Sequence, residues 1–193
     1  MNSVNFCGIQ IKMAEEPISE RIEVGRIGAR TFATGALVQM MVMFLFWGSF
    51  AMLGSSAIDI PVLTTNGITY IVISGRSAAA ILPTFLFTGI GFSLLLFGYG
   101  FRVGRAIWRK KGRYLIPSLL VVLIIAVMIG TIGGWILRGS NVVSSHLIDF
   151  FVIVTFILPS FLMAVLSGWI TKKRLEDFAF KAGIEWQNEE FLD

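Results

Sequence analysis

The chain has 193 residues, of which 55% are apolar and only 15% are charged. A soluble domain carries nearer a quarter charged residues, and long uncharged runs instead indicate an integral membrane protein. The only cysteine, Cys7, excludes a scaffold of intrachain disulfides, and the only histidine, His146, excludes bis-histidine haem ligation within the chain. The net charge of +4 does not indicate nucleic-acid binding, because the basic residues cluster beside the apolar runs.

Residues 1–32 form a polar N-terminal segment. Pro17 follows two acids, and proline and acidic side chains both fit the first turn of a helix. We therefore expect a short helix at the cytoplasmic interface, with a frayed tail as the alternative. The first apolar run is too long for a signal peptide, and Met13 is an alternative start of translation.

Four apolar runs are each long enough to cross a hydrocarbon core of about 30 Å, which takes about 20 helical residues. The predicted spans are residues 33–54, 79–101, 115–137 and 147–170. The expected fold is all-α, with four transmembrane helices in two antiparallel hairpins. Pro159 lies within the fourth span and predicts a kink, and we expect Thr155 to satisfy the carbonyl group that the proline frees.

Residues 55–78, between the first two spans, are the only stretch with strand character. Asn66-Gly67 between β-branched runs predicts a β-hairpin with a type I′ turn, and Pro61 restricts its strand to an edge. An isolated hairpin is marginal in water, so we expect it to dock on a partner, on another copy or on the helix ends. An ordered loop without a partner is the alternative. The alternation places Ile68, Tyr70 and Val72 on one face and Thr69, Ile71 and Ile73 on the other.

The loop at residues 102–114 is strongly basic and contains no acid. Basic loops stay on the cytoplasmic side, and a cytoplasmic N-terminus leaves only Arg76 and Arg138, of 16 lysines and arginines, outside. Both termini are then cytoplasmic, and the hairpin and the loop at 138–146 are extracytoplasmic. The tail at 171–193 is expected to extend the fourth helix amphipathically and to weaken at Gly183. The short loops and the single cysteine are typical of a bacterial cytoplasmic membrane, and an organellar inner membrane is the alternative. The basic side chains of the loop are Arg102, Arg105, Arg109, Lys110, Lys111 and Arg113.

Polar residues near the spans are the candidates for a functional site. Arg138, His146 and Asp149 form a candidate polar cluster at the extracytoplasmic mouth, either as an ion relay or partner contact, or as a helix-terminal acid with an interfacial ion pair. Gln39 is expected to donate an interhelical hydrogen bond, with a pore or ligand contact as the alternative. The methionines at 40, 41 and 43 point to different sides of a helix and favour packing over metal binding.

Small residues at helical spacing predict close helix packing. The basic loop is a candidate site for anionic lipid headgroups or for an acidic partner, in addition to its role in topology. The predicted packing positions are Gly89, Ser93, Gly130, Gly134, Ser160, Ala164 and Gly168.

No catalytic, cofactor or metal motif is recognisable, so we expect a protein that is not an enzyme and binds no cofactor. The leading hypothesis is a non-catalytic subunit that anchors or scaffolds an inner-membrane complex of secretion, transport or electron transfer. Its expected partners are the lipid bilayer and other membrane subunits, or further copies of itself. A homo-oligomeric channel or transporter, with Thr155, Ser160 and Ser167 as the polar lining, is the second hypothesis. An accessory that binds lipid or quinone between its helices is the third.

Overall fold

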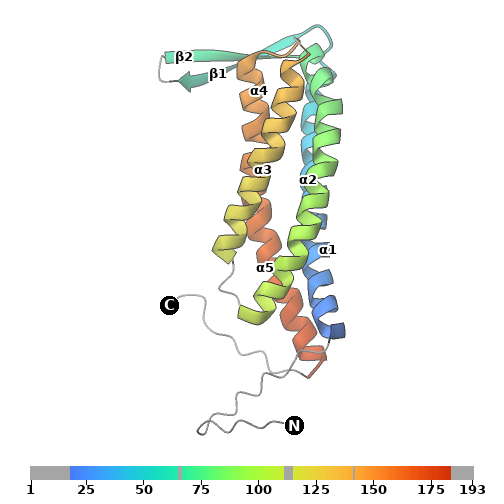
Figure 1. The fold of residues 1–193 in the computed structure, drawn as a ribbon. Coiled ribbons are helices and arrows are strands. Elements are labelled where there is room, and N and C mark those ends of the chain that lie inside the picture. The colour runs from blue at the N-terminus through green and yellow to red at the C-terminus, as the bar shows by residue number, and fades with distance from the viewer. Residues whose placement is uncertain (1–17, 65–66, 111–114, 141, 184–193) are drawn as a thin grey trace, which may run out of the picture.

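The computed structural model describes residues 18–64, 67–110, 115–140 and 142–183. Within them lie four helices long and apolar enough to span a membrane and one two-stranded antiparallel sheet, as expected (Figure 1). The fourth of these helices has three consecutive parts, of which the middle one, η1, is a π-helix. The elements are α1 Ile18–Ala51, β1 Ala57–Thr64, β2 Gly67–Ser74, α2 Gly75–Lys110, α3 Leu115–Arg138, α4 Ser145–Val152, η1 Ile153–Ile157 and α5 Leu158–Lys181.

The helices form an antiparallel bundle in which α1 contacts α2 and α5, α2 contacts α3, and α3 contacts α4, η1 and α5 (Figure 1). We call the end that carries the sheet the hairpin end, and the end where α1 begins and α5 stops the terminal end. Aromatic side chains fill the centre of the bundle without solvent exposure, so the interior is packed rather than open. They are Trp47, Phe85, Phe92, Phe151 and Phe156.

The helices run further toward the terminal end than the hydropathy pattern predicts. Helix α1 has 34 residues and α2 has 36, which makes each of them about 50 Å long. The short helix expected within residues 1–32 is not separate, because it continues directly into the first span as α1. Val24 and Phe32 are buried in the common core, which explains why the helix continues through this polar stretch.

The basic segment expected to be a loop is mostly helical, since α2 extends to Lys110. Val103 and Ile107 are buried there, and the Trp108 ring meets Phe178 of α5 edge-on at 5.7 Å between centroids. These contacts hold the helix together beyond its apolar span. Lys111 and Arg113 lie outside the described residues.

The predicted amphipathic extension of the fourth helix is present as the last turns of α5. Leu175 is buried, Phe178 packs against the core, and the helix stops at Lys181. Gly183 follows with φ of +68°, a left-handed conformation that suits glycine after a helix end. Trp186, which is expected to continue the apolar stripe, lies outside the described residues.

Helices α1 and α2 touch through backbone near the terminal end. A Cβ atom placed on Gly28 would lie 2.2 Å from the carbonyl oxygen of Gly100 and 2.7 Å from Cα of Gly104. Only glycine fits at such a crossing. Gly28 and Gly104 lie outside the predicted spans, so the hydropathy pattern gives no reason to select them as packing positions.

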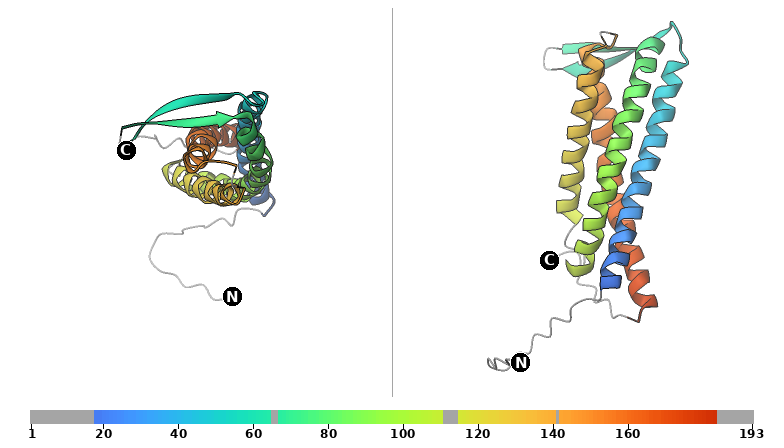
Figure 2. Two further views of the ribbon diagram at one scale, coloured as in Figure 1. Left: turned by 90° about the horizontal axis from the view of Figure 1, so that it is seen from above. Right: turned by 45° about the vertical axis from the view of Figure 1, so that its right-hand side comes forward.

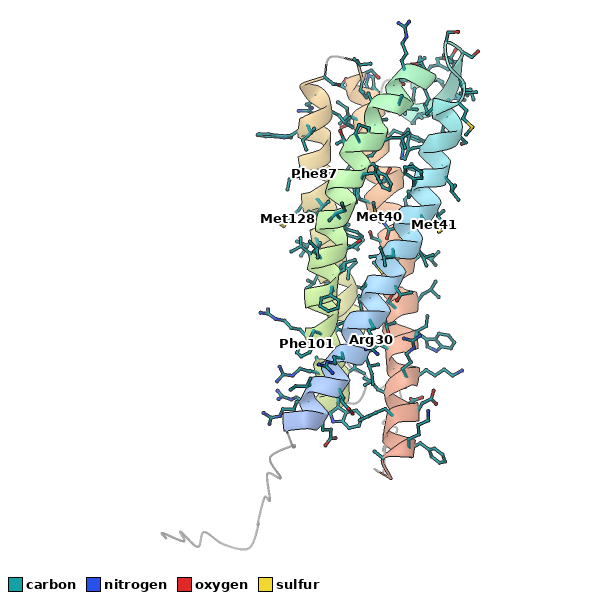
Figure 3. All side chains as sticks on the ribbon, turned by 90° about the vertical axis from the view of Figure 1, so that its right-hand side faces the viewer. Arg30, Met40, Met41, Phe87, Phe101 and Met128 are labelled. Carbon is teal, nitrogen blue, oxygen red and sulfur yellow. The ribbon has the colours of Figure 1, made fainter. Side chains whose placement is uncertain are left out.

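Met40 and Met41 point to different sides of α1, as the spacing of the methionines predicts (Figure 3). Met40 packs so closely on α2 that a Cβ atom on Gly89 would clash with it, whereas Met41 is exposed on the bundle surface. Met43 packs against the core. The three sulfur atoms therefore do not face a common point, and packing is the role that their positions support.

Candidate functional site

A buried polar cluster joins α1 to the π-helix in the middle of the bundle. Pro159 has no N–H group, so the carbonyl group of Thr155, four residues earlier, loses its usual helical donor. Gln39 Nε2 donates to this carbonyl oxygen at 3.1 Å. The sequence predicts that Thr155 satisfies the freed carbonyl group, but the freed group belongs to Thr155 itself and its donor comes from another helix.

The remaining polar atoms of this cluster are paired as well. Trp47 Nε1 donates to the hydroxyl of Thr155 at 2.8 Å, and Gln39 Nε2 also lies 3.2 Å from Ser160 Oγ. Trp47, Thr155 and Ser160 are all almost fully buried, where an unpaired polar group would cost free energy. The predicted interhelical hydrogen bond of Gln39 is therefore present, and the cluster locks the π-helix to α1.

This cluster contains no ionisable side chain, so it holds no acid or base that could activate the hydroxyl groups of Thr155 and Ser160. Within the part of the chain that the structure describes, no group of three His, Cys, Asp or Glu side chains is placed to hold a metal ion. The sequence does not indicate the participation of Trp47, because its position near the end of the first span suggests an interfacial ring. A π-helix that ends two residues before a proline is the feature that brings these residues together.

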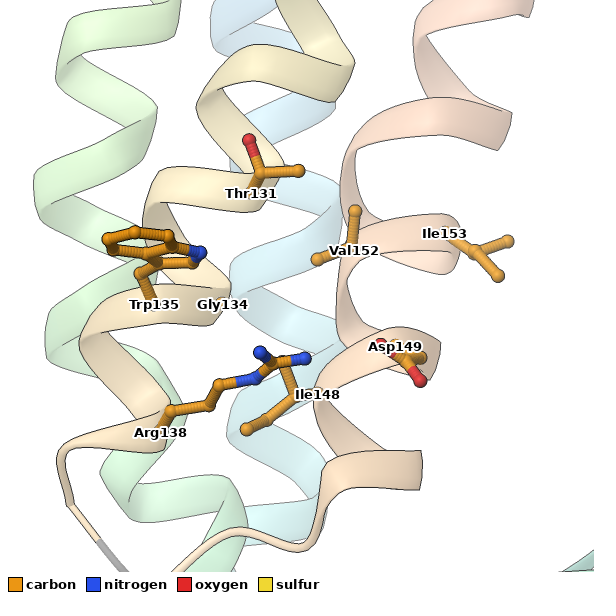
Figure 4. Close-up of a pocket in the computed structure, with 8 residues that line it drawn as sticks. All are labelled: Thr131, Gly134, Trp135, Arg138, Ile148, Asp149, Val152 and Ile153. Carbon is orange, nitrogen blue, oxygen red and sulfur yellow. The ribbon is translucent and has the colours of Figure 1, made fainter.

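The predicted extracytoplasmic cluster is only partly assembled. Arg138 and Asp149 line one pocket of about 420 Å³ between α3 and α4 (Figure 4). Asp149 points away from Arg138, and among the described residues these two form no ion pair. His146 is exposed and does not line the pocket. The pocket is otherwise bounded by Thr131, Gly134, Trp135, Ile148, Val152 and Ile153.

Basic side chains of the predicted loop lie on the last turns of α2. Arg102 and Arg109 are exposed, and the guanidinium group of Arg105 lies 5.8 Å from the centroid of the Phe101 ring. The position of Lys110 is helical. Together they place positive charge around the terminal end of the bundle, at a level where the helices have left their apolar spans.

Most of the predicted small-residue positions lie at contacts inside this chain. Cβ atoms placed on Gly130 and Gly134 would touch Val152 and Ile148, and Gly89 meets Met40. Ser160, Ala164 and Gly168 are buried along α5, and Ser93 is half-buried. These small residues therefore bring helices of one chain together, and little of their surface is left for a second protein.

The β-hairpin is held on the helix ends by one of its two faces. Ile71 and Ile73 are buried, while Ile68, Tyr70 and Val72 of the alternate face are exposed, which matches the predicted alternation. The hairpin runs across the ends of the helices and projects beyond the bundle (Figures 1 and 2). Docking on its own helix ends, one of the three expected outcomes, is therefore observed for one face.

The base of the hairpin is tightly joined to α2. Gly75 follows β2 directly, and a Cβ atom there would lie 2.4 Å from the carbonyl oxygen of Gly54. Ser77 N–H donates to Ser74 Oγ at 3.2 Å, and Ser74 N–H donates to Ser77 Oγ at 3.0 Å, so the two serines cap the start of α2 reciprocally.

The turn of the hairpin lies one residue earlier in the chain than the predicted turn at Asn66-Gly67. Thr64 pairs with Gly67, so Gly67, with φ of +115°, begins β2 instead of occupying the centre of the turn. Residues 65–66 of the turn lie outside the described residues. Pro61 lies in β1, whose partner is β2, so β1 is an edge strand as expected.

Comparison of this chain with protein-family models, with curated proteins and with solved structures finds no match to any of them. The fold and the arrangement of its surfaces are therefore the basis for assigning a function.

Proposed function

We propose that this protein is a non-catalytic membrane subunit that anchors a partner protein through the exposed face of its β-hairpin. The observation that carries the proposal is the outer face of β2, where Ile68 and Tyr70 are 65% and 60% exposed and Val72 is also exposed. Exposed apolar side chains that cluster beyond the spanning helices favour a protein contact.

The way in which the hairpin is fixed supports this role. Its inner face is buried through Ile71 and Ile73, and its base is held at the contact between Gly54 and Gly75. A partner therefore meets a surface that is ordered in advance, which lowers the entropic cost of binding. Pro61 removes a backbone donor from β1, so the face is a better contact surface than that strand edge.

In this proposal the terminal end is cytoplasmic and the hairpin end is extracytoplasmic, in a bacterial inner membrane or its organellar counterpart. Support comes from the distribution of basic residues, since among the described lysines and arginines only Arg76 and Arg138 lie near the hairpin end. The partner surface of the hairpin then faces the extracytoplasmic space. The partner is accordingly an extracytoplasmic domain or loop of another membrane subunit.

The test is purification in mild detergent from cells that naturally make the protein, with the native mass of the complex as the readout. We expect a discrete complex with a stoichiometric partner, which a Tyr70→Asp substitution on the outer face disrupts. The matched control is Met52→Asp, which introduces the same charge at an exposed apolar side chain between α1 and β1, outside the hairpin strands. A wild-type protein that purifies as a discrete homo-oligomer without a partner would contradict the anchoring role.

The alternative of a homo-oligomeric channel receives less support. Thr155 and Ser160, two of its three expected lining residues, are buried within the chain and hydrogen bonded to α1. Hydroxyls used in this way do not line a pore between copies. Ion flux through liposomes that contain only this protein would be the result that restores the channel hypothesis.

A further inference from the structure

A long groove opens on the surface of the bundle between α1 and α5, along the half of the predicted spans 33–54 and 147–170 that is nearer the terminal end. Its volume is about 620 Å³, and it extends along α1 from Thr31 to Met43 and along α5 from Arg174 to Leu158. At 1.5 Å per helical residue, this is a length of about 20 Å. That length matches one leaflet of a hydrocarbon core of about 30 Å, with a small excess at the headgroup level.

The lining of the groove is apolar along most of its length and carries a positive charge at one end. Apolar side chains such as Val38, Leu162 and Leu166 form its walls and are open to lipid, being roughly half exposed or more. Arg174 is the one ionisable residue in the lining, and it lies at the end of the groove that is nearer the terminal end of the bundle. Arg174 Nη1 is 3.5 Å from the hydroxyl of Thr31, so the guanidinium group is held at the mouth of the groove.

We propose that this groove binds one acyl chain of an anionic phospholipid, with the phosphate at Arg174. Charge complementarity selects an anionic headgroup, because the guanidinium group pairs with the phosphate through two parallel donors, and in a zwitterionic lipid the ammonium group of the headgroup offsets the phosphate charge. The apolar walls and the length of the groove select the tail. The lipid comes from the leaflet that adjoins the terminal end.

The inner end of this groove reaches the polar cluster of the π-helix. Gln39 and Pro159 both contribute to the lining, and Gln39 is the residue that donates to the Thr155 carbonyl group. At the floor, a Cβ atom on Gly35 would lie 2.5 Å from Ser167 Oγ, so the two helices are in close contact beneath the bound chain. A lipid in the groove therefore covers the contact between α1 and α5 and shields Gln39 from other occupants.

The experiment is lipid binding by native mass spectrometry of the full chain, with phosphatidylglycerol and phosphatidylcholine of identical acyl chains as probes. We expect one tightly bound phosphatidylglycerol and weaker phosphatidylcholine. Arg174→Gln should weaken phosphatidylglycerol binding about fivefold, which corresponds to about 1 kcal/mol for a basic residue near an anionic lipid. The matched control is Lys173→Gln, because the Lys173 ammonium group lies over the Trp169 ring and does not line the groove.

A second pair of variants tests the acyl-chain site without changing charge. Val38→Trp fills the groove and should abolish the tight binding of phosphatidylglycerol and the weaker binding of phosphatidylcholine, whereas Phe87→Trp on the exposed surface of α2 should leave binding unchanged. Equal phosphatidylglycerol binding in these two variants would overturn the proposal. So would equal affinity of the wild-type chain for the two lipids, or an organic extract in which the retained ligand is a phosphate-free quinone. These outcomes are independent of the hairpin face, so they leave the proposed anchoring function to its own test.

Discussion

At the scale of single residues, Gln39 and Pro159 explain why the fourth helix has its shape. Pro159 removes one backbone donor. At the end of the π-helix before it, the N–H group of Leu158 donates to the carbonyl group of Ile153, five residues earlier. In hydrocarbon no water is present to satisfy the remaining carbonyl groups. Gln39, 116 residues away in sequence from Thr155, supplies the donor instead.

This relation predicts a specific coupling between residues 39 and 159. Gln39→Ala should destabilise the protein by about 1 kcal/mol, because the Thr155 carbonyl group and Ser160 lose a buried partner. Pro159→Ala provides an N–H group four residues after Thr155, so the same Gln39→Ala change should cost less in that background. The measurement is a double-mutant cycle by unfolding in mixed micelles with increasing SDS.

Additivity of the two substitutions within experimental error would contradict the coupling. A parallel cycle between Gln39→Ala and Ser160→Ala separates the contribution of the serine hydroxyl from that of the carbonyl group. Thr34→Ala is a suitable control, since Thr34 is exposed on the same helix and its hydroxyl bonds only to the local Arg30 carbonyl group.

At the scale of elements, hydropathy identifies the four helices but not where they end. The predicted spans are bounded by the apolar runs, so the first begins at Ala33 and the second ends at Phe101. Helices α1 and α2 extend beyond these bounds because Val24, Val103 and Ile107 are buried between the helices. A residue's burial in tertiary contacts is not visible in a local pattern. Gly28 and Gly104 do not stand out as packing positions for the same reason, since both lie beyond the predicted spans.

The sequence is more informative where a local rule determines the structure. The alternation of β-branched residues predicts the two faces of the hairpin correctly, and Gly183 marks the end of α5. The polar cluster is only half predictable. Gln39 and Pro159 each stand out, but their connection depends on how α1 packs on the fourth helix, and only the three-dimensional arrangement contains that information.

The glycine contact between α1 and α2 leads to a prediction with an internal control. Gly28→Ala should destabilise the bundle by about 1–3 kcal/mol, because the added methyl group meets the backbone of Gly100 and Gly104. Gly48→Ala on the same helix meets nothing within 4 Å and should stabilise the helix by about 0.5–1 kcal/mol. Thermal unfolding in detergent measures both. A neutral Gly28→Ala variant would show that the two helices are not in backbone contact.

At the scale of the whole molecule, the two ends of the bundle have different physical character. The terminal end carries exposed basic side chains such as Arg102 and Arg109, on helices that extend beyond their apolar spans. The hairpin end carries an exposed apolar face on β2. The proposed lipid groove opens toward the first end and the proposed partner surface lies at the second. A single orientation in the membrane therefore fixes the side from which each is reached.

That orientation is tested by labelling single cysteines in a Cys7→Ser background, in intact cells that lack the native partner. Met52→Cys, at the hairpin end, replaces a side chain that is 89% exposed, and Phe180→Cys, at the terminal end, replaces one that is 87% exposed. A membrane-impermeant maleimide should label residue 52 in intact cells and residue 180 only after permeabilisation, because basic segments are retained in the cytoplasm. Met41→Cys, on the lipid-facing surface of α1, should be labelled in neither case. The reverse pattern at residues 52 and 180 would place the hairpin in the cytoplasm and would remove the extracytoplasmic partner from the proposed function.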